Sequence, residues 1–263
     1  MTGSVLAPAK VNLTLHVTGR RADGYHLLDS IVAFADLGDR LTVGPGDGLI
    51  VTGPFAAGVP TDDGNLIRRA LALAGTPRAV ALDKRLPHPA GLGGGSSDAA
   101  AVLRAVGADL SPEYLLTLGA DLPVCMGARA ARMRGIGEVV VPVPLPPLAA
   151  VLVNPGLAVP TGRVFAGLRT ADNPGHDALP EGDAAAWMDW LAAQRNDLEE
   201  PALALAPEIA EMLAALRAEG AAVARMSGSG ATCFGLWPDR GQAEAAAGRL
   251  VRSGWWGRAC TLS

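Results

Sequence analysis

The sequence predicts an α+β protein of two domains, and three observations support this prediction. The chain has 263 residues, a length between one large domain and two ordinary ones. Strand-like alternation and helix-like spacing of apolar residues occur in both halves. A segment interrupted by four prolines, residues 142–147, separates the halves, so we predict domains at residues 1–147 and 148–263.

The chain opens with two predicted strands and an exposed loop. Apolar and polar residues alternate from Val11 to Val17, which is the period of a half-buried strand and places Lys10 and Asn12 on its polar face. Residues 19–24 contain the glycines, aspartate and arginines of an exposed turn. A second apolar strand is expected through residues 31–35.

The middle of the chain alternates helix and strand. Residues 65–74 predict a helix ended by a glycine, and residues 79–86 predict a strand that leads into a glycine cluster. A helix should begin at residues 96–97, where serine and aspartate side chains supply capping groups, and end near Val106. A shorter helix should follow from Ser111, with proline in its first turn.

The second half begins with a predicted strand at residues 149–153, followed by several helices. Two strands should flank residues 226–230, with a helix and a last strand after them. Residues 207–219 should form an amphipathic helix that ends at Gly220, because apolar residues recur there at helical spacing. These apolar residues are Ile209, Met212, Leu213 and Leu216.

The bulk composition limits the function. The net charge of −4 argues against a broad electrostatic grip on nucleic acid, so an anionic ligand must be held locally. No basic stretch precedes an apolar block near the N-terminus, and prolines break the most apolar run. We therefore expect a cytoplasmic protein with no nucleic-acid or membrane partner, either a monomer or a homodimer.

Cysteine and histidine predict no metal site. The three cysteines are an odd number without a CxxC pair, so we expect buried free thiols and neither disulfides nor structural zinc. None of the four histidines pairs with another histidine or cysteine at metal-ligand spacing. The sequence therefore identifies no protein ligands for a metal ion.

Only two of the 22 basic residues are lysines, Lys10 and Lys84. The chain thus uses arginine almost wherever a general positive charge is enough. An ammonium group is compact and has three rotatable donors, whereas a guanidinium is a broad planar fork. Each lysine therefore points to a site that needs a point charge, although chance alone could also leave two lysines.

The strongest local signal is the run PAGLGGGSSDAA at residues 89–100, between a predicted strand and a predicted helix. Glycines let the main chain approach a bulky anion, and the helix start adds a partial positive charge, so we predict a phosphate-binding loop. A flexible turn is the alternative, but three consecutive glycines reduce stability without improving packing. The loop lacks the GxxxxGK[ST] pattern of a P-loop, and a dinucleotide fingerprint would need glycine at Ser96.

Three shorter stretches are ambiguous by themselves. Residues 226–232 could be a second glycine loop or an ordinary hairpin turn. Asp121 could be a turn or capping residue, but with Lys10 it also supplies the carboxylate and the cation that phosphoryl transfer to an alcohol requires. Tyr25 and His26 could stack on a base and bind its edge, or form a partly buried pair at a strand entrance.

Three motifs, in this order, resemble those of the GHMP kinases (galactokinase, homoserine kinase, mevalonate kinase and phosphomevalonate kinase). They are PAKVNL at residues 8–13, GLGGGSS at residues 91–97 and SGSGAT at residues 227–232. Further stretches resemble the branch of this family that phosphorylates a cytidine-diphosphate-linked methylerythritol on the non-mevalonate route to isoprenoid precursors. These stretches are residues 19–26, 37–39, 119–123, 135–138 and 195–198, together with Pro160, Thr161 and Phe165.

The resemblance covers nearly the whole chain and implies a two-domain GHMP kinase fold. Its N-terminal domain would be like the second domain of ribosomal protein S5, and its C-terminal domain would be ferredoxin-like. ATP and Mg²⁺ are implied as partners, with transfer of the γ-phosphate to the 2-hydroxyl of the acceptor. Lys10 and Asp121 are the implied catalytic pair. The implied ATP loop is Pro87, His88, Pro89, Ala90, Gly91, Leu92, Gly93, Gly94, Gly95, Ser96 and Ser97, and the implied substrate-binding residues are Asn12, Tyr25, His26, Thr161 and Phe165.

Two alternatives to this function stay open. One is another GHMP kinase acting on mevalonate, homoserine or a sugar, against which the Tyr25–His26 loop argues. The other is a nucleotide-binding module without catalysis, against which Lys10 and Asp121 argue. The link between Val106 and Ser111 is shorter than expected for the family, which affects the packing around the adenine.

Overall fold

The computed structural model describes residues 3–251 and 254–263, and it confirms a mixture of strands and helices in both halves. The strands are β1 (Val5–Asn12), β2 (His16–Arg20), β3 (His26–Gly44), β4 (Gly48–Thr52), β5 (Ala79–Asp83), β6 (Ala131–Gly135), β7 (Val139–Pro142), β8 (Leu148–Asn154), β9 (Val223–Met226), β10 (Cys233–Trp237) and β11 (Trp256–Leu262). The helices are α1 (Leu66–Leu73), α2 (Gly94–Ala105), α3 (Pro112–Leu116), α4 (Leu122–Gly127), α5 (Thr161–Ala166), α6 (Ala184–Ala192), α7 (Glu199–Leu205), α8 (Glu208–Ala218) and α9 (Arg240–Leu250).

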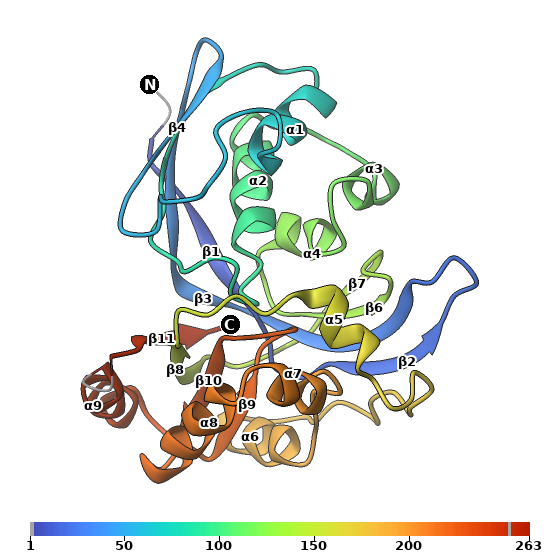
Figure 1. Cartoon of the computed structure of the whole chain (residues 1–263), viewed down its shortest axis with the longest axis vertical. Helices are drawn as coiled ribbons and strands as arrows, with labels where there is room; N and C mark the ends of the chain where they lie inside the picture. Colours follow the sequence, from blue (N-terminus) through green and yellow to red (C-terminus); the bar gives the residue numbers. More distant parts are fainter. Residues whose placement is uncertain (1–2, 252–253) are drawn as a thin grey trace.

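One sheet, of eleven strands in the described part of the chain, connects the two halves of the molecule (Figure 1). Its main path runs β4-β5-β3-β11-β8-β10-β9, with β1, β2 and β6 also paired to β3, and β7 paired to β6. The last strand, β11, lies between β3 and β8, and the main chain of Ser263 exchanges two hydrogen bonds with Phe34. The chain end therefore joins the N-terminal half to the C-terminal half.

The helices form two groups on either side of the central strands. Helices α1 to α4 lie in one half, and α6 to α9 lie in the other (Figure 1). One core cluster contains buried residues from both, such as Val11 and Ile31 together with Leu152 and Phe234. Burial of this shared apolar surface holds the two halves in contact. In residues 3–251 and 254–263, no helix has the length and apolarity needed to cross a membrane.

Several local predictions are confirmed. Helix α1 begins after Asn65, whose side chain accepts the Ile67 amide at 2.9 Å as an N-cap. Helix α3 begins at Pro112, and α8 buries all four apolar residues predicted to face the core. All three cysteines are free and buried.

The predicted single strand from Val11 to Val17 is wrong. Strand β1 ends at Asn12 and β2 begins at His16, and the polar residues Asn12, Thr14 and His16 are as buried as their apolar neighbours. The C-terminal half covers the face that was expected to be exposed, since His176 contacts the Thr14 hydroxyl at 2.7 Å and stacks on the His16 ring. The alternation of polar and apolar residues therefore could not show that a distant segment of the chain buries the polar face of this strand.

The start of the helix after the glycine loop was also predicted wrongly. Helix α2 begins at Gly94, two residues earlier than expected, and Gly93 is its N-cap with no capping side chain. The Ser97 hydroxyl instead donates to the Pro8 carbonyl at 2.7 Å, and Asp98 pairs with Lys84. These two side chains face the protein interior, because β1 and β3 pack behind this helix.

The strand predicted at residues 79–86 is shorter than expected. Strand β5 ends at Asp83. The amides of Arg85 and Leu86 donate to Asp39 Oδ1 at 2.6 and 2.9 Å, so they leave the sheet ladder. The chain is thereby turned into the glycine loop.

Candidate active site

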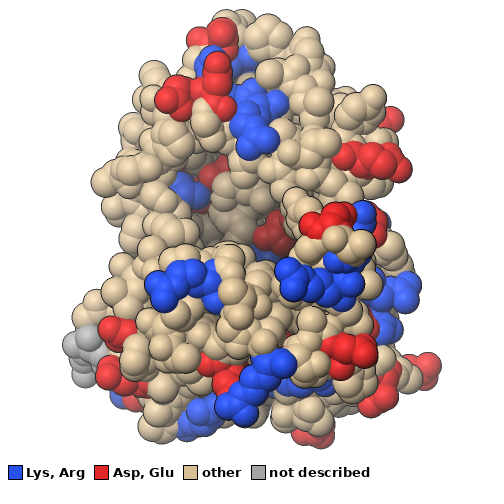
Figure 2. Space-filling model, turned by 45° about the vertical axis from the view of Figure 1, so that its right-hand side comes forward, with Lys and Arg blue, Asp and Glu red and all other residues tan. Residues whose placement is uncertain are grey.

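A cleft of about 430 Å³ lies between the two halves of the molecule. One wall is the glycine loop, and the floor includes Lys10, Asn12 and Asp121. The opposite wall comes from α5 and from residues 228–230, which connect β9 to β10. Figure 2 shows a hollow between an upper and a lower part of the molecule, with acidic and basic side chains inside it. We call this space the inner cavity.

The glycine loop presents an open helix start to the inner cavity. Gly93 has a φ of 61°, and its carbonyl accepts the first helical hydrogen bond, from the Ser97 amide at 2.8 Å. The first amides of a helix have no partner within the helix, and no side chain caps this one. The amides of Gly94, Gly95 and Ser96 are therefore available to an anion, which the helix dipole also favours.

Two positions in this loop require glycine. Gly91 has a φ of 72°, and a Cβ there would lie 2.5 Å from the Ser227 carbonyl oxygen. A Cβ on Gly93 would lie 2.9 Å from Cε of Lys10. The loop is thus in close contact with the β9–β10 connection on one side and with Lys10 on the other, and any side chain at these positions would separate them.

Lys10 and Asp121 meet at the floor of the inner cavity. Lys10 Nζ lies 2.9 Å from Asp121 Oδ1 and also donates to Asn12 Oδ1 at 2.8 Å. Lys10 is buried, whereas the Asp121 side chain is 31% exposed. Asp121 precedes α4 but makes no capping hydrogen bond, so the capping interpretation is wrong. Two of the three ammonium hydrogens are engaged by these oxygens, which leaves one for a substrate oxygen.

The loop between β9 and β10 is both a hairpin connection and a wall of the inner cavity. The Ser227 hydroxyl donates to the Gly91 carbonyl at 2.9 Å and accepts the Asn12 amide at 3.1 Å. Thr161 Oγ1 and Ser229 Oγ lie 2.8 Å apart. Asn196 donates to the carbonyls of residues 226 and 228, each at 2.8 Å. The predicted site residues Asn12 and Thr161 are thus held by serines that sequence reasoning did not select, although the SGSGAT motif contained them.

A second cavity of about 700 Å³ adjoins the first, and we call it the outer cavity. Leu28, Ala120 and Phe165 line both cavities. Tyr25 and His26 line the outer cavity only, and the His26 ring stacks on Phe165 with centroids 4.8 Å apart. Tyr25 is 60% exposed at the rim. The structure therefore brings together the three aromatic residues predicted to bind the acceptor.

The chemistry of the outer cavity suits a planar, polar ring. Burial, with the nearby Arg20, lowers the pKa of His26 below its ordinary value, so the imidazole is neutral at pH 7. A neutral imidazole has one nitrogen that donates and one that accepts, and the exposed face of Tyr25 can stack. These are the groups that recognise the edge and the face of a base.

One predicted loop residue does not reach the inner cavity. Pro87 to Ser96 line it, but Ser97 is buried and bound to the Pro8 carbonyl. The ring of His88 is also engaged, with Nε2 lying 2.8 Å from the Phe55 carbonyl oxygen. Ala90 and Leu92 bury their side chains, so they offer main-chain atoms to a ligand.

A buried ion cluster lies behind the glycine loop. Lys84 Nζ contacts Asp98 Oδ2 at 2.9 Å and also contacts Asp39 Oδ2, and all three residues are at most 3% exposed. A Cβ on Gly94 would lie 3.0 Å from Lys84 Nζ. Burial raises the pKa of Asp98 to about 7, and the nearby Asp39 carboxylate adds to this rise while the Lys84 ammonium opposes it. The scarcity of lysine in the sequence was the signal that pointed to Lys84. The cluster that Lys84 forms lies directly behind the start of α2 and supports it.

Mg²⁺ usually binds through one or two carboxylates, several waters and the phosphates of its substrate. Among residues 3–251 and 254–263, no group of three or more His, Cys, Asp or Glu side chains could hold a metal ion. The Ser96 hydroxyl and the Asp121 carboxylate are oxygen donors in the inner cavity beside the glycine loop. These residues fit a Mg²⁺ ion that is held mainly by the phosphates of ATP.

Comparisons with known proteins agree with this arrangement. Residues 65–137 match the GHMP kinases N terminal domain, and residues 176–255 match the GHMP kinases C terminal model. The predicted boundary between residues 147 and 148 lies outside both ranges and stays a prediction. The chain is also similar over its whole length to solved structures of this family. One, a crystal structure of 4-(cytidine 5′-diphospho)-2C-methyl-D-erythritol kinase, is 42% identical, with a TM-score of 0.82 and 99% of each chain covered.

More distant structures show the same fold. One of them, L. major mevalonate kinase in complex with R-mevalonate, is 17% identical, with a TM-score of 0.65, covering 100% of this chain and 96% of that chain. This similarity supports the fold alone, because the sequences have diverged so far. It confirms the predicted two-domain GHMP kinase architecture.

Close relatives narrow the assignment. The 4-diphosphocytidyl-2-C-methyl-D-erythritol kinase of Paracoccus denitrificans is 54% identical, over 98% of this chain and 96% of the relative. The enzyme of the same name from Dinoroseobacter shibae is 56% identical, over 95% of this chain and 91% of the relative. The chain therefore belongs to the GHMP kinases and, within them, to the 4-diphosphocytidyl-2-C-methyl-D-erythritol kinase family.

Proposed function

We propose that this protein transfers the γ-phosphate of ATP to the 2-hydroxyl of 4-diphosphocytidyl-2-C-methyl-D-erythritol. The observation that supports this most directly is the 2.9 Å contact between Lys10 and Asp121, beside the uncapped start of α2. An outer cavity with base-binding groups adjoins this pair through Phe165. A nucleotide-linked alcohol spanning both cavities would bring its hydroxyl to the carboxylate.

The residues of the inner cavity suggest how the transfer proceeds. The amides of the glycine loop hold the phosphates, and the free N–H of Lys10 stabilises charge on the transferring group. The acceptor oxygen forms a bond to the γ-phosphorus as the bond to the bridging oxygen of ADP breaks, and the hydroxyl proton passes to Asp121. Mg²⁺, held by the phosphates with Ser96 and Asp121 nearby, would neutralise part of the phosphate charge.

A screen of ADP release tests this function. The purified protein would receive ATP and Mg²⁺ with the cytidine-linked methylerythritol, with mevalonate, with homoserine, or with no acceptor. We expect rapid ADP formation with the cytidine substrate only. A preference for mevalonate or homoserine would support another GHMP kinase activity, and no acceptor-dependent ADP with any alcohol would support a non-catalytic nucleotide-binding module.

Replacing the residues of the outer cavity should change acceptor binding selectively. Tyr25→Ala and His26→Ala should each raise KM for the cytidine substrate by roughly 5- to 150-fold, because each removes about 1–3 kcal/mol of base stacking or edge recognition. KM for ATP should change little, since neither side chain lines the inner cavity. Steady-state kinetics with each substrate varied in turn checks this. Tyr114→Ala, at a tyrosine that is 58% exposed in α3, is a matched control.

A further inference from the structure

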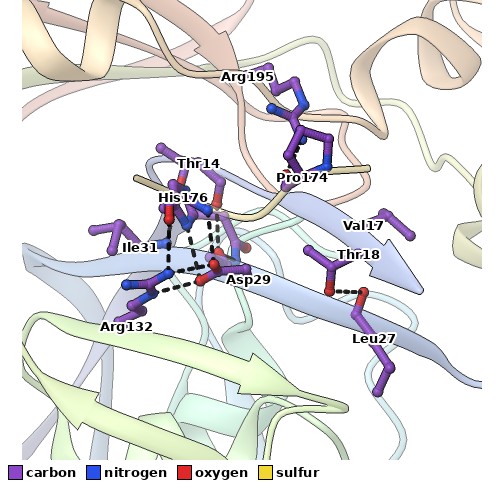
Figure 3. Close-up of polar contacts among 12 residues, drawn as sticks. Thr14, Val17, Thr18, Leu27, Asp29, Ile31, Arg132, Pro174, His176 and Arg195 are labelled. Carbon is purple, nitrogen blue, oxygen red and sulfur yellow. Dashed lines mark hydrogen bonds and ion pairs between the residues drawn. The ribbon is translucent and has the colours of Figure 1, made fainter. Parts of the chain in front are cut away.

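A buried charged cluster ties the segment after α5 to the central sheet (Figure 3). Asp29 on β3 receives two hydrogen bonds from the Arg132 guanidinium of β6, at 2.8 and 2.6 Å. His176, between α5 and α6, donates its main-chain amide to Asp29 Oδ2 at 3.0 Å. Its ring Nδ1 also lies 3.0 Å from Asp29 Oδ1, at the distance of an ion pair but without the alignment of a hydrogen bond. We call Asp29, Arg132 and His176 the clamp.

Further contacts hold His176 in place from the other side. Its Nε2 lies 2.7 Å from the Thr14 hydroxyl, which in turn accepts the Ile31 amide. The ring stacks on His16, with centroids 3.9 Å apart. The His176 side chain is completely buried, and Asp29 is 4% exposed. A buried bidentate ion pair with aligned partners is a rigid connection, because each broken contact would leave a charge unpaired.

The electrostatics keep two members of the clamp, Asp29 and Arg132, charged. Burial alone would raise the pKa of Asp29, but the hydrogen bonds from the Arg132 guanidinium and from His176 outweigh it and hold this pKa well below its usual range. The same interaction raises the pKa of Arg132. Burial, followed by the nearby His176, lowers the pKa of His16 to about 4, so the His16 ring is neutral at pH 7.

The segment bound by the clamp is fitted closely along four consecutive residues. Asn173 donates its side chain to the Val17 carbonyl at 3.0 Å, and the Pro174 carbonyl accepts from Arg195 at 2.6 Å. A Cβ on Gly175 would lie 2.7 Å from Asp29 Oδ2, so only glycine lets the main chain approach the carboxylate this closely. Residues 173–176 are therefore fixed to β2 and β3 at several points.

These contacts lie between the two walls of the outer cavity. One wall is the β2–β3 hairpin, with Tyr25, His26 and Leu28, and Asp29 is the next residue along β3. The other wall is residues 165–171, which come directly before the bound segment in the chain. In the described part of the chain, residues 167–183 form no helix or strand that could fix this wall. Phe165, Leu168 and Ala171 of this wall pack against the C-terminal core, and the bound segment adds the attachment to β2 and β3.

We infer that the clamp positions the walls of the outer cavity, so that Asp29, Arg132 and His176 are positioning residues for the cytidine moiety of the acceptor. This inference rests on the proposed function. None of the three residues lines the inner cavity, so ATP binding does not depend on them directly. Loosening the clamp should therefore weaken acceptor binding and leave nucleotide binding intact.

Two variants that loosen the same segment test this inference. Arg132→Met removes the bidentate partner of Asp29. Asn173→Ala removes an outer anchor without changing any clamp residue, although it also loses a 3.2 Å contact with Asp197 Oδ2. Each should raise both KM for the cytidine substrate and Kd for cytidine diphosphate by roughly tenfold or more, since displacing a binding wall by an ångström has effects of this size. KM for ATP and Kd for ADP should stay within about twofold. Arg132→Lys should bind the acceptor more tightly than Arg132→Met and less tightly than the wild type. It keeps the positive charge but lacks the planar guanidinium that makes two hydrogen bonds to Asp29.

The controls separate positioning from a general loss of structure. Arg240→Met removes an exposed arginine that also contacts two carboxylates, Asp36 and Glu244, and it should change neither KM. The inference would be overturned if KM for ATP and KM for the cytidine substrate rose equally. It would also be overturned if Arg132→Met and Asn173→Ala both folded and left KM for the cytidine substrate unchanged. If Arg132→Met does not fold, Asn173→Ala decides the question. Wild-type protein that binds no cytidine diphosphate would contradict the proposed function as well, whereas equal binding by wild type and variants would contradict the clamp alone.

Discussion

Asp121→Asn should lower kcat by about 10²–10⁴-fold, the range typical of losing a positioned proton acceptor. The amide keeps the size of the side chain but cannot accept the hydroxyl proton. Since the glycine loop supplies the phosphate contacts, Kd for ATP should change by less than about threefold. Steady-state ADP release, together with calorimetric titration of ATP, measures both quantities.

The control for this variant is Asp109→Asn, at an exposed aspartate in the link before α3. It should leave kcat unchanged. Because Lys10 Nζ and Asp121 Oδ1 are in direct contact, the pair should act as a unit, and Lys10→Met combined with Asp121→Asn should be little worse than the more damaging single change. An Asp121→Asn protein with kcat near that of the wild type would remove Asp121 from the proposed role.

Lys84→Met should destabilise the fold by about 3–5 kcal/mol, because it leaves the buried carboxylates of Asp39 and Asp98 facing each other without a cation. Urea unfolding followed by circular dichroism measures the free energy of unfolding. Arg78→Met is the control, at a partly exposed arginine whose guanidinium donates, among the described residues, only to the adjacent Pro77 carbonyl; it should be nearly neutral.

The limited space around the Lys84 ammonium allows a second comparison, between Lys84→Arg and the wild type. Gly94 lies so close to Lys84 Nζ that the larger guanidinium of Lys84→Arg should not restore full stability, despite keeping the charge. Adding Asp98→Asn to Lys84→Met should recover part of the loss, since only one buried carboxylate then lacks a partner. Equal stability of Lys84→Met and the wild type would show that the cluster does not support the fold.

Much of the molecule was predictable because it depends on residues close together in the chain. The limits of α1, α3 and α8 follow from caps, prolines and helical spacing. The glycine loop was identified by its composition, and the motif order pointed to the family. Residues 91–96 and the aromatic residues at 25, 26 and 165 line two adjoining cavities, and their roles in binding stay a prediction.

The sequence by itself determined most of the helices, the position of the glycine loop and the family, because these depend on short-range patterns. Only the tertiary structure decided which side chains meet: Lys10 reaches Asp121 across 111 positions, and Asp29 meets Arg132 across 103. It also decided that Asn12, Thr14 and His16 are buried, since the C-terminal half covers their face. The period of a strand records how neighbouring residues alternate, but contacts between distant segments depend on packing the whole chain, and no local pattern encodes them.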